Sequence, residues 1–247
     1  MTVDYKWTPS VHTYAKVAKA YRAGGADSIN YTFLSSSLAT FKPEHLVSYE
    51  LGLKSLWWDD RLRFNADVFE EKYRDIQLGF YGPNFQEFIT ANAGQATIKG
   101  AEGAVEFIPV DGLKLSAAFN YLSSNATQTN PFTLVTLVQE LPNVPKWKTT
   151  VSAEYTFTRL SVGTLAALVS HDYHAKELWL PGDYRPAYSL VDARLTLSDI
   201  PVAQGDFSLA LWGKNLTDKQ YQVYHNYNDV VFGQPRSFGL SMNYNYR

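Results

Sequence analysis

The sequence predicts an all-β protein: an antiparallel transmembrane β-barrel segment of about ten strands plus a partial first strand. Three observations predict it. Apolar and polar residues alternate along most of the chain, connections between these stretches are alternately short and long, and aromatic residues make up 15% of the sequence. Together they predict short periplasmic turns, long extracellular loops and an apolar face that meets lipid.

The alternation is clearest at the end of the chain, in "SFGLSMNYNYR". Small or polar residues there separate five large apolar ones, as in a strand with one apolar and one wet face. Similar stretches lie at 47–57, 62–68, 113–121, 147–157, 191–197 and 207–211, with weaker ones at 11–22, 97–109 and 160–173, and no helix is expected. The apolar face of the last strand, which we expect to serve barrel assembly, carries Phe238, Leu240, Met242, Tyr244 and Tyr246.

The connections distinguish a membrane barrel from a soluble sandwich. Short connections at 8–10, 58–61, 110–113, 157–160 and 200–206 alternate with long ones near 22–44, 79–96, 122–146, 172–187 and 216–234. A soluble sandwich has no reason to place every long loop at one end, whereas outer-membrane barrels do so. The alternative, in which the aromatic residues are ordinary core or edge residues of a sandwich, is less favoured because aromatics gather towards the strand ends.

Composition excludes several classes of protein. The formal net charge of −2 offers no basic stripe for nucleic acid. The chain has no cysteine and no apolar run long enough for a membrane helix. Its start, "MTVDYKW", resembles no signal peptide, and Asp4–Trp7 read as the end of a strand already in progress, so we expect a longer protein or one whose leader was removed.

Several segments, taken in order, resemble the later barrel strands of TonB-dependent outer-membrane receptors. They include "FKPEHLVSYELGLKS" at 41–55, "NAGQATIKGAEGAVEF" at 92–107 and "WGKNLTDKQY" at 212–221. The resemblance covers essentially the whole chain. It implies that residues 1–247 form the C-terminal part of a 22-stranded receptor barrel whose plug domain and first half are absent here.

The resemblance also implies a function and partners. Such receptors sit in the Gram-negative outer membrane and import scarce ligands, most often ferric siderophores, with energy relayed by TonB through the N-terminal region. The expected partners are therefore outer-membrane lipid, the missing plug and half-barrel, TonB through that missing part, the barrel-assembly machinery and an iron chelate. No cofactor, resident metal, catalytic residue or nucleic acid is expected.

Aromatic residues in the predicted extracellular loops are the candidate ligand contacts, because rigid aromatic faces beside polar groups suit a large amphipathic chelate. An equal alternative is that they pack the loops against one another. The candidates are Tyr81, Phe85, Phe88, Tyr173, Trp179, Tyr184, Tyr224, His225 and Tyr227.

Charged residues on the polar faces are expected to line the lumen and to pair with each other or with the plug. They are Glu50, Lys54, Arg63, Asp67, Glu102, Glu106, Glu154, Asp192 and Arg194. His171 and His174 could hold a metal with Asp172, but ordinary loop polarity is the favoured interpretation. The alternatives for the whole chain are a passive pore or translocator barrel and, less favoured, a ten-stranded outer-membrane protease acting through Asp172 and one of these histidines.

Overall fold

β-Strands are the only regular secondary structure among the residues that the structure describes. The computed structural model describes residues 1–27, 40–81, 88–157, 160–225 and 229–246, apart from the side chain of His225. Within these ranges no helix is both long and apolar enough to cross a membrane.

Among the described residues, twelve strands form one antiparallel sheet, in which β9 (Thr136–Gln139) pairs only with β8. Without the added strand β9 and the first strand β1, the sheet has ten strands. This confirms the predicted number of about ten strands plus a partial first strand. The other strands, in spatial order, are β1 (Thr2–Thr8), β2 (Val11–Arg22), β5 (Glu44–Trp57), β6 (Leu62–Tyr81), β7 (Phe88–Val110), β8 (Leu113–Thr129), β10 (Trp147–Thr156), β11 (Thr164–His174), β14 (Tyr188–Val202), β15 (Gly205–Lys214) and β18 (Ser237–Tyr246).

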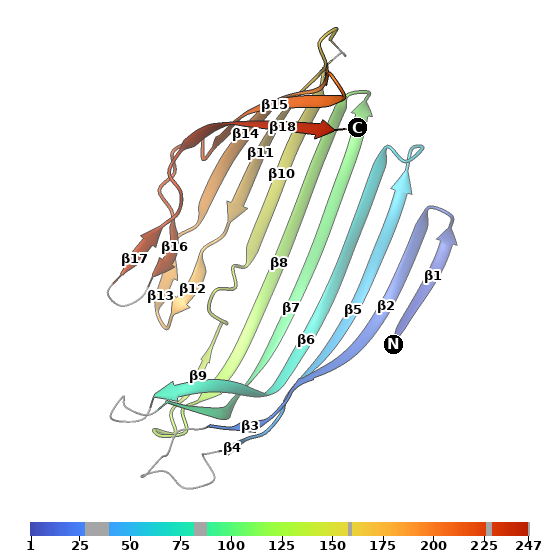
Figure 1. The fold of residues 1–247 in the computed structure, drawn as a ribbon. Helices are drawn as coiled ribbons and strands as arrows, with labels where there is room; N and C mark the ends of the chain where they lie inside the picture. Colours follow the sequence, from blue (N-terminus) through green and yellow to red (C-terminus); the bar gives the residue numbers. More distant parts are fainter. Residues whose placement is uncertain (28–39, 82–87, 158–159, 226–228, 247) are drawn as a thin grey trace.

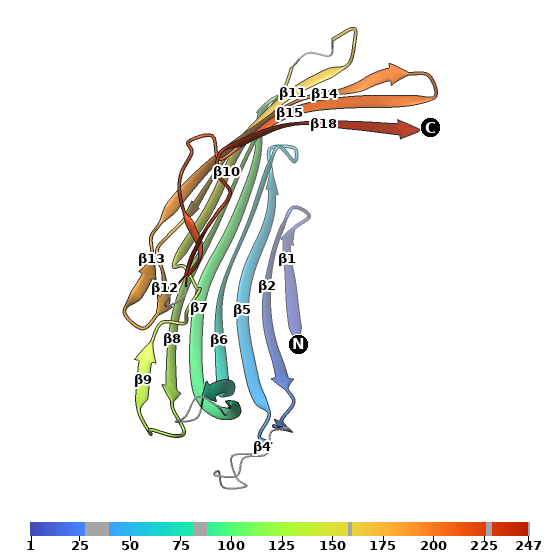
Figure 2. The ribbon, with the colours of Figure 1, turned by 60° about the vertical axis from the view of Figure 1, so that its left-hand side comes forward.

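The sheet is curved like part of a cylinder wall, and its connections divide between its two ends (Figure 1). Tight turns lie at one end, and the small paired strands lie at the other, which we call the loop end (Figure 1). β1 and β18 form the two edges of the sheet, and within the described residues they do not pair with each other (Figure 2). The small pairs are β3 (Gly25–Ala26) with β4 (Thr40–Phe41), β12 (Glu177–Leu180) with β13 (Asp183–Arg185), and β16 (Gln222–His225) with β17 (Val230–Phe232).

Some of the predicted long connections are shorter in the structure, because the strands beside them continue beyond the stretch of clear alternation. The expected loop at 79–96 was wrong in extent: β6 runs to Tyr81 and β7 starts at Phe88. The expected loop at 122–146 likewise contains the end of β8 and the added strand β9. Backbone pairing sustains these extensions where side-chain alternation has faded.

Strand register confirms that the two faces differ as predicted. Leu51, Val68 and Ala101 lie opposite one another on β5, β6 and β7, so they share one face. The neighbouring row, Gly52, Asp67 and Glu102, occupies the other face. The first face, called the outer face below, exposes large apolar side chains over many strands, which suits lipid rather than water.

The inner face carries the charged residues expected to line the lumen. Glu50 accepts hydrogen bonds from the Tyr14 hydroxyl at 2.7 Å and the Lys16 ammonium at 2.9 Å. Tyr14 lies flat across Gly52 of the next strand, where a β-carbon would fall 2.3 Å from its ring. Only glycine therefore lets this ring lie against the wall beside Glu50.

A second cluster of paired charges lies nearer the short turns. Glu106 is 3.7 Å from Arg63 and 3.5 Å from Lys114. The prediction that these lumenal charges pair with each other is therefore confirmed for Arg63 and Glu106, whereas Glu50 pairs with Lys16, which was not among the predicted residues.

Alternation in the last strand is also confirmed. Phe238, Leu240, Met242, Tyr244 and Tyr246 all lie on one face of β18, with Leu240 directly opposite Leu211 of β15. All five side chains are exposed in this structure, as lipid-facing residues of a barrel would be. Their role in barrel assembly stays a prediction.

Candidate functional site

Two hairpins meet at the loop end of the sheet and form the candidate site. The β12–β13 hairpin turns at Pro181-Gly182, where Gly182 has a φ of +82°, a backbone conformation that glycine adopts without strain. The second hairpin is β16–β17, which belongs to the connection between β15 and β18.

Arg185, the last residue of β13, joins the two hairpins. Its guanidinium forms an ion pair with Glu177 of β12 and donates to the Val223 carbonyl of β16. It also donates to the side-chain oxygen of Asn143, in the segment before β10, at 3.2 Å. One planar cation thus connects three segments that are far apart in sequence.

Burial strengthens this junction. The side chains of Arg185 and Glu177 are 14% and 13% exposed. Among the described residues, the Arg185 Nε is buried and has no hydrogen-bond partner. The guanidinium is thus held inside the junction by its ion pair with Glu177 and by its hydrogen bonds to the neighbouring segments.

Aromatic rings surround the guanidinium. Trp179 of β12 lies 4.9 Å below the Arg185 guanidinium, measured to its ring centroid, and meets the Tyr224 ring edge-on at 5.3 Å. Tyr184 of β13, whose side chain is exposed, lies beneath the Lys176 ammonium at 5.2 Å. Three of the aromatic residues predicted from sequence are therefore gathered on the two hairpins around Arg185.

A row of stacked rings extends from these hairpins to the inner face of the sheet. His174 stacks on Tyr188 with centroids 4.8 Å apart and planes 7° apart, and Tyr188 stacks on Tyr221 at 4.6 Å. Tyr221 in turn lies against Gly233, where a β-carbon would fall 2.0 Å from the Tyr221 ring. The missing side chain at Gly233 thus gives the Tyr221 ring the room it occupies.

The base of the β16–β17 connection is held by Asn215, which is 3% exposed. Its side-chain amide donates to the carbonyls of Lys219 and Gln234 at 2.9 and 3.1 Å, and its side-chain oxygen accepts from the Lys219 amide at 2.8 Å. Its own amide donates to Asp192 on the inner face at 2.8 Å. One buried side chain therefore closes the loop that presents Tyr221 and Tyr224.

A separate clamp holds the connection between β2 and β5. The side chain of Gln77, 8% exposed, donates to the carbonyls of Ala23 and Lys42 at 2.8 and 3.1 Å. Asn92 donates to the same Lys42 carbonyl at 2.8 Å. Both ends of this connection are thereby fastened to β6 and β7.

One exposed ion pair lies on the segment that leads into β10. The Lys146 ammonium is 2.9 Å from the Glu140 carboxylate, and the hydrogen bond between them raises the pKa of Lys146 above its usual value. The pair leaves no net charge beside Trp147.

Several predicted site residues lie elsewhere than expected. Tyr173 was placed in a loop, but it belongs to β11 and faces outward opposite Thr149. Tyr81 and Phe88 were also expected in a loop; they are paired strand residues whose rings meet at 5.1 Å. Phe85 and Tyr227 lie outside the described residues, and His225 ends β16 with its side chain outside them.

The histidine pair does not converge. His171 lies opposite Val151 on the outer face, whereas His174 lies opposite Lys148 on the inner face. Asp172 shares the inner face and accepts a hydrogen bond from the Thr150 hydroxyl at 2.6 Å. Because His171 and His174 are on opposite faces, they cannot share one metal ion, and within the described residues no group of three potential ligands is close enough to hold one.

Sequence reasoning missed the residues that organise the site. Arg185, Glu177, Asn143 and Asn215 were not singled out, because each acts through partners distant in sequence. The one available signal was local: Asn215 lies in "NLTDK", a segment whose resemblance to other receptors was noted without assigning a role to the asparagine.

Comparison with known proteins gives one family. Residues 2–216 match the model of the family described as TonB dependent receptor-like, beta-barrel. The chain is 24% identical over 215 residues to the ferric-pyoverdine M114 receptor PbuA of Pseudomonas sp. strain M114, covering 83% of this chain and 25% of that protein. It is 23% identical over 251 residues to the probable TonB-dependent siderophore receptor PiuA of Acinetobacter baumannii, covering 96% and 32%.

Solved structures show the same fold. The crystal structure of the ferric yersiniabactin uptake receptor FyuA from Yersinia pestis superposes with a TM-score of 0.76 at 19% identity, covering 98% of this chain and 36% of that one. The chain spans only about a quarter to a third of the length of its curated relatives.

Proposed function

Because the chain belongs to the TonB-dependent receptor β-barrel family, we propose that it forms the C-terminal barrel wall of a receptor that imports a ferric siderophore or a similar iron chelate. The family places the chain in the bacterial outer membrane, as a β-barrel segment. Receptors of this family are transport proteins rather than enzymes.

The observation that carries the proposal is the cluster around Arg185 at the loop end. Trp179 and Tyr224 offer aromatic faces beside a mostly buried guanidinium. Aromatic faces suit the organic part of a chelate, and a guanidinium suits its anionic oxygens. The relatives PbuA and FyuA are receptors for ferric pyoverdine and ferric yersiniabactin, which supports a ferric chelate as the ligand class.

The remaining partners follow from the same proposal. A plug domain and the other barrel strands, encoded beyond this chain, would close the wall between β1 and β18. TonB would contact that other part. The exposed apolar face of β18 would be presented to the barrel-assembly machinery and then to lipid.

Uptake of radioactive iron tests the proposal. Cells that make the whole protein would be given ⁵⁵Fe on a panel of siderophores, with matched cells lacking the protein and matched cells lacking TonB. We expect one chelate to be taken up only when both the protein and TonB are present. Uptake that needs the protein but not TonB would support the passive-pore alternative instead, and no uptake of any chelate would contradict the ligand class.

A further inference from the structure

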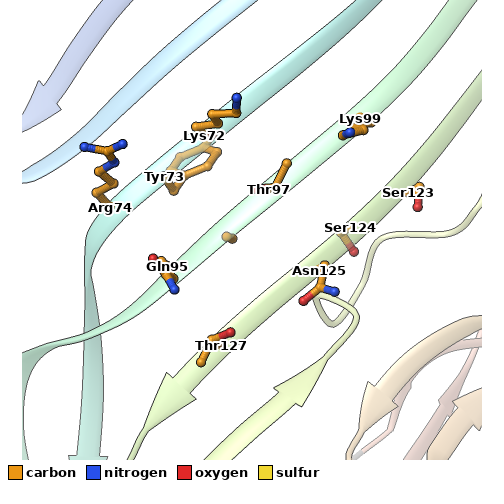
Figure 3. A pocket seen from close by; sticks show the side chains of 11 residues that line it. Lys72, Tyr73, Arg74, Gln95, Thr97, Lys99, Ser123, Ser124, Asn125 and Thr127 are labelled. Atoms are coloured by element: carbon orange, nitrogen blue, oxygen red, sulfur yellow. The ribbon is translucent and has the colours of Figure 1, made fainter.

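A cationic cleft opens on the outer face of the sheet, away from the candidate ligand site. Its volume is about 490 Å³, and its walls come from three neighbouring strands, β6, β7 and β8 (Figure 3). Eight lining residues alternate onto the outer face: Lys72, Arg74, Gln95, Thr97, Lys99, Ser123, Asn125 and Thr127. The other three, Tyr73, Ala96 and Ser124, alternate with them along the strands, and Ala96 is buried.

Register fixes the side on which the cationic residues point. Lys72 lies two positions beyond Glu70 and four beyond Val68 on β6, so all three share the outer face. Lys99 lies opposite Glu70, and Thr97 lies opposite Lys72. The cationic side chains therefore share their face with the residues that contact lipid, and not with the lumen.

Height along the strands fixes the level of the cleft. The row just below Lys99 contains Val68, Ala101 and Tyr121, and Tyr121 packs against Trp147 with ring centroids 4.6 Å apart. Aromatic pairs of this kind mark the boundary between hydrocarbon and headgroups. Because the loop end is extracellular, the cleft lies at the headgroup level of the outer leaflet.

The charge at this level is positive. Lys72 and Lys99 share the outward carboxylate of Glu70, at 2.9 and 3.3 Å. Arg74 adds a third cation to the wall of the cleft, and its side chain is exposed. All three charged residues that line the cleft, Lys72, Arg74 and Lys99, are therefore cations.

We propose that this cleft binds the phosphate-bearing headgroup of an outer-leaflet lipid, with Lys72, Arg74 and Lys99 as the phosphate ligands. Hydroxyl and amide side chains of Ser123, Asn125 and Thr127 complete a wall that can donate hydrogen bonds to headgroup oxygens. A lipid is the occupant that fits, because the cleft continues directly into the apolar belt below it, where acyl chains lie. This binding is independent of the imported ligand.

Lipid binding to the purified whole protein tests the proposal. Diphosphoryl lipid A would be titrated into the protein in nonionic detergent and bound lipid counted by native mass spectrometry. The test variant is Lys72→Gln/Arg74→Gln/Lys99→Gln. The matched control, Lys54→Gln/Lys114→Gln/Lys148→Gln, removes the same charge from the inner face of the sheet.

We expect affinity to fall about fivefold for each outward cation removed, and on the order of a hundredfold for all three. The control should bind as the unchanged protein does. Equal losses in both triple variants would overturn the proposal, because net charge rather than placement would then explain binding. An unchanged affinity in the test variant would overturn it as well.

Two further arms keep the result decisive if the triple variant does not fold. Glu70→Gln removes the competing carboxylate and should tighten binding about fivefold; weaker or equal binding would contradict the proposed site. Millimolar inorganic phosphate should not displace the lipid, since the acyl chains add affinity that free phosphate lacks. Full displacement would show a site for free phosphate rather than for a lipid.

Discussion

Removal of Arg185 should separate the two hairpins of the candidate site without unfolding the barrel wall. Arg185→Ala deletes the ion pair with Glu177 and the hydrogen bonds to Asn143 and the Val223 carbonyl. Removing one partner of a buried ion pair costs about 3–5 kcal/mol. Since both side chains are about one-seventh exposed, we take the lower end, about 3 kcal/mol.

Hydrogen exchange of two backbone amides reports this loss. The Asn143 amide donates to the Leu178 carbonyl at 2.9 Å, and the Gly233 amide donates to the Tyr221 carbonyl at 2.8 Å. A local loss of about 3 kcal/mol corresponds to roughly a hundredfold faster exchange at these amides. Amides in the paired centre of β10 and β11 should exchange as before.

Lys176→Ala is the matched control, since it removes a neighbouring cation that lies over the exposed ring of Tyr184. An exposed cation–π contact contributes about 0.5–1 kcal/mol, so exchange at the two amides should change less than about fivefold. If Arg185→Ala changes exchange no more than Lys176→Ala does, the reasoning that Arg185 joins the hairpins is refuted.

Three other substitutions test separate parts of the structure. Asn215→Ala removes three side-chain hydrogen bonds at the base of the connection that contains β16 and β17, each of which contributes about 1 kcal/mol to stability. Proteolysis of that connection should therefore be faster. Unchanged cleavage would contradict the role of Asn215 in holding the connection. Gly233→Val would put a side chain where the Tyr221 ring lies, so the affinity for the chelate should fall. Heat-modifiable gel migration, which reports the folded barrel, should persist. An unchanged affinity would show that the stacked rings do not matter for binding. Val151 faces lipid midway between Trp147 and Tyr155, so Val151→Arg should lower the free energy of unfolding in lipid vesicles by about 2–4 kcal/mol. Ser152 faces the lumen, so Ser152→Arg should have little effect. A larger loss for Ser152→Arg than for Val151→Arg would contradict the assignment of faces.

The fold was predictable because its main determinant is local. A period of two is visible in any strand with one apolar face, and turn residues such as Pro and Gly mark where strands reverse. Strand ends were less predictable. Residues such as Gly79 and Gly94 interrupt the side-chain pattern, yet their backbones remain paired in β6 and β7.

The candidate site was only partly predictable, for a physical reason. Trp179, Tyr184 and Tyr224 stood out by residue type, and the structure gathers them on neighbouring hairpins. Arg185 did not stand out, because its importance lies in contacts with Glu177 and with segments tens of residues away. Tyr173 was misplaced because β11 continues past the point where a loop was expected.

The most direct test of the account is whether a ferric chelate binds at the hairpins around Arg185. These 247 residues contain no cysteine, so Pro181→Cys at the tip of the β12–β13 hairpin can carry a fluorescent label, and Pro9→Cys in the short turn after β1 serves as its control. Both positions are exposed. With the chelate that supports uptake, the account predicts saturable quenching of the label at Pro181→Cys and none at Pro9→Cys. Saturable binding of that chelate with no quenching at Pro181→Cys, or equal quenching at both positions, would contradict the assignment of the ligand site.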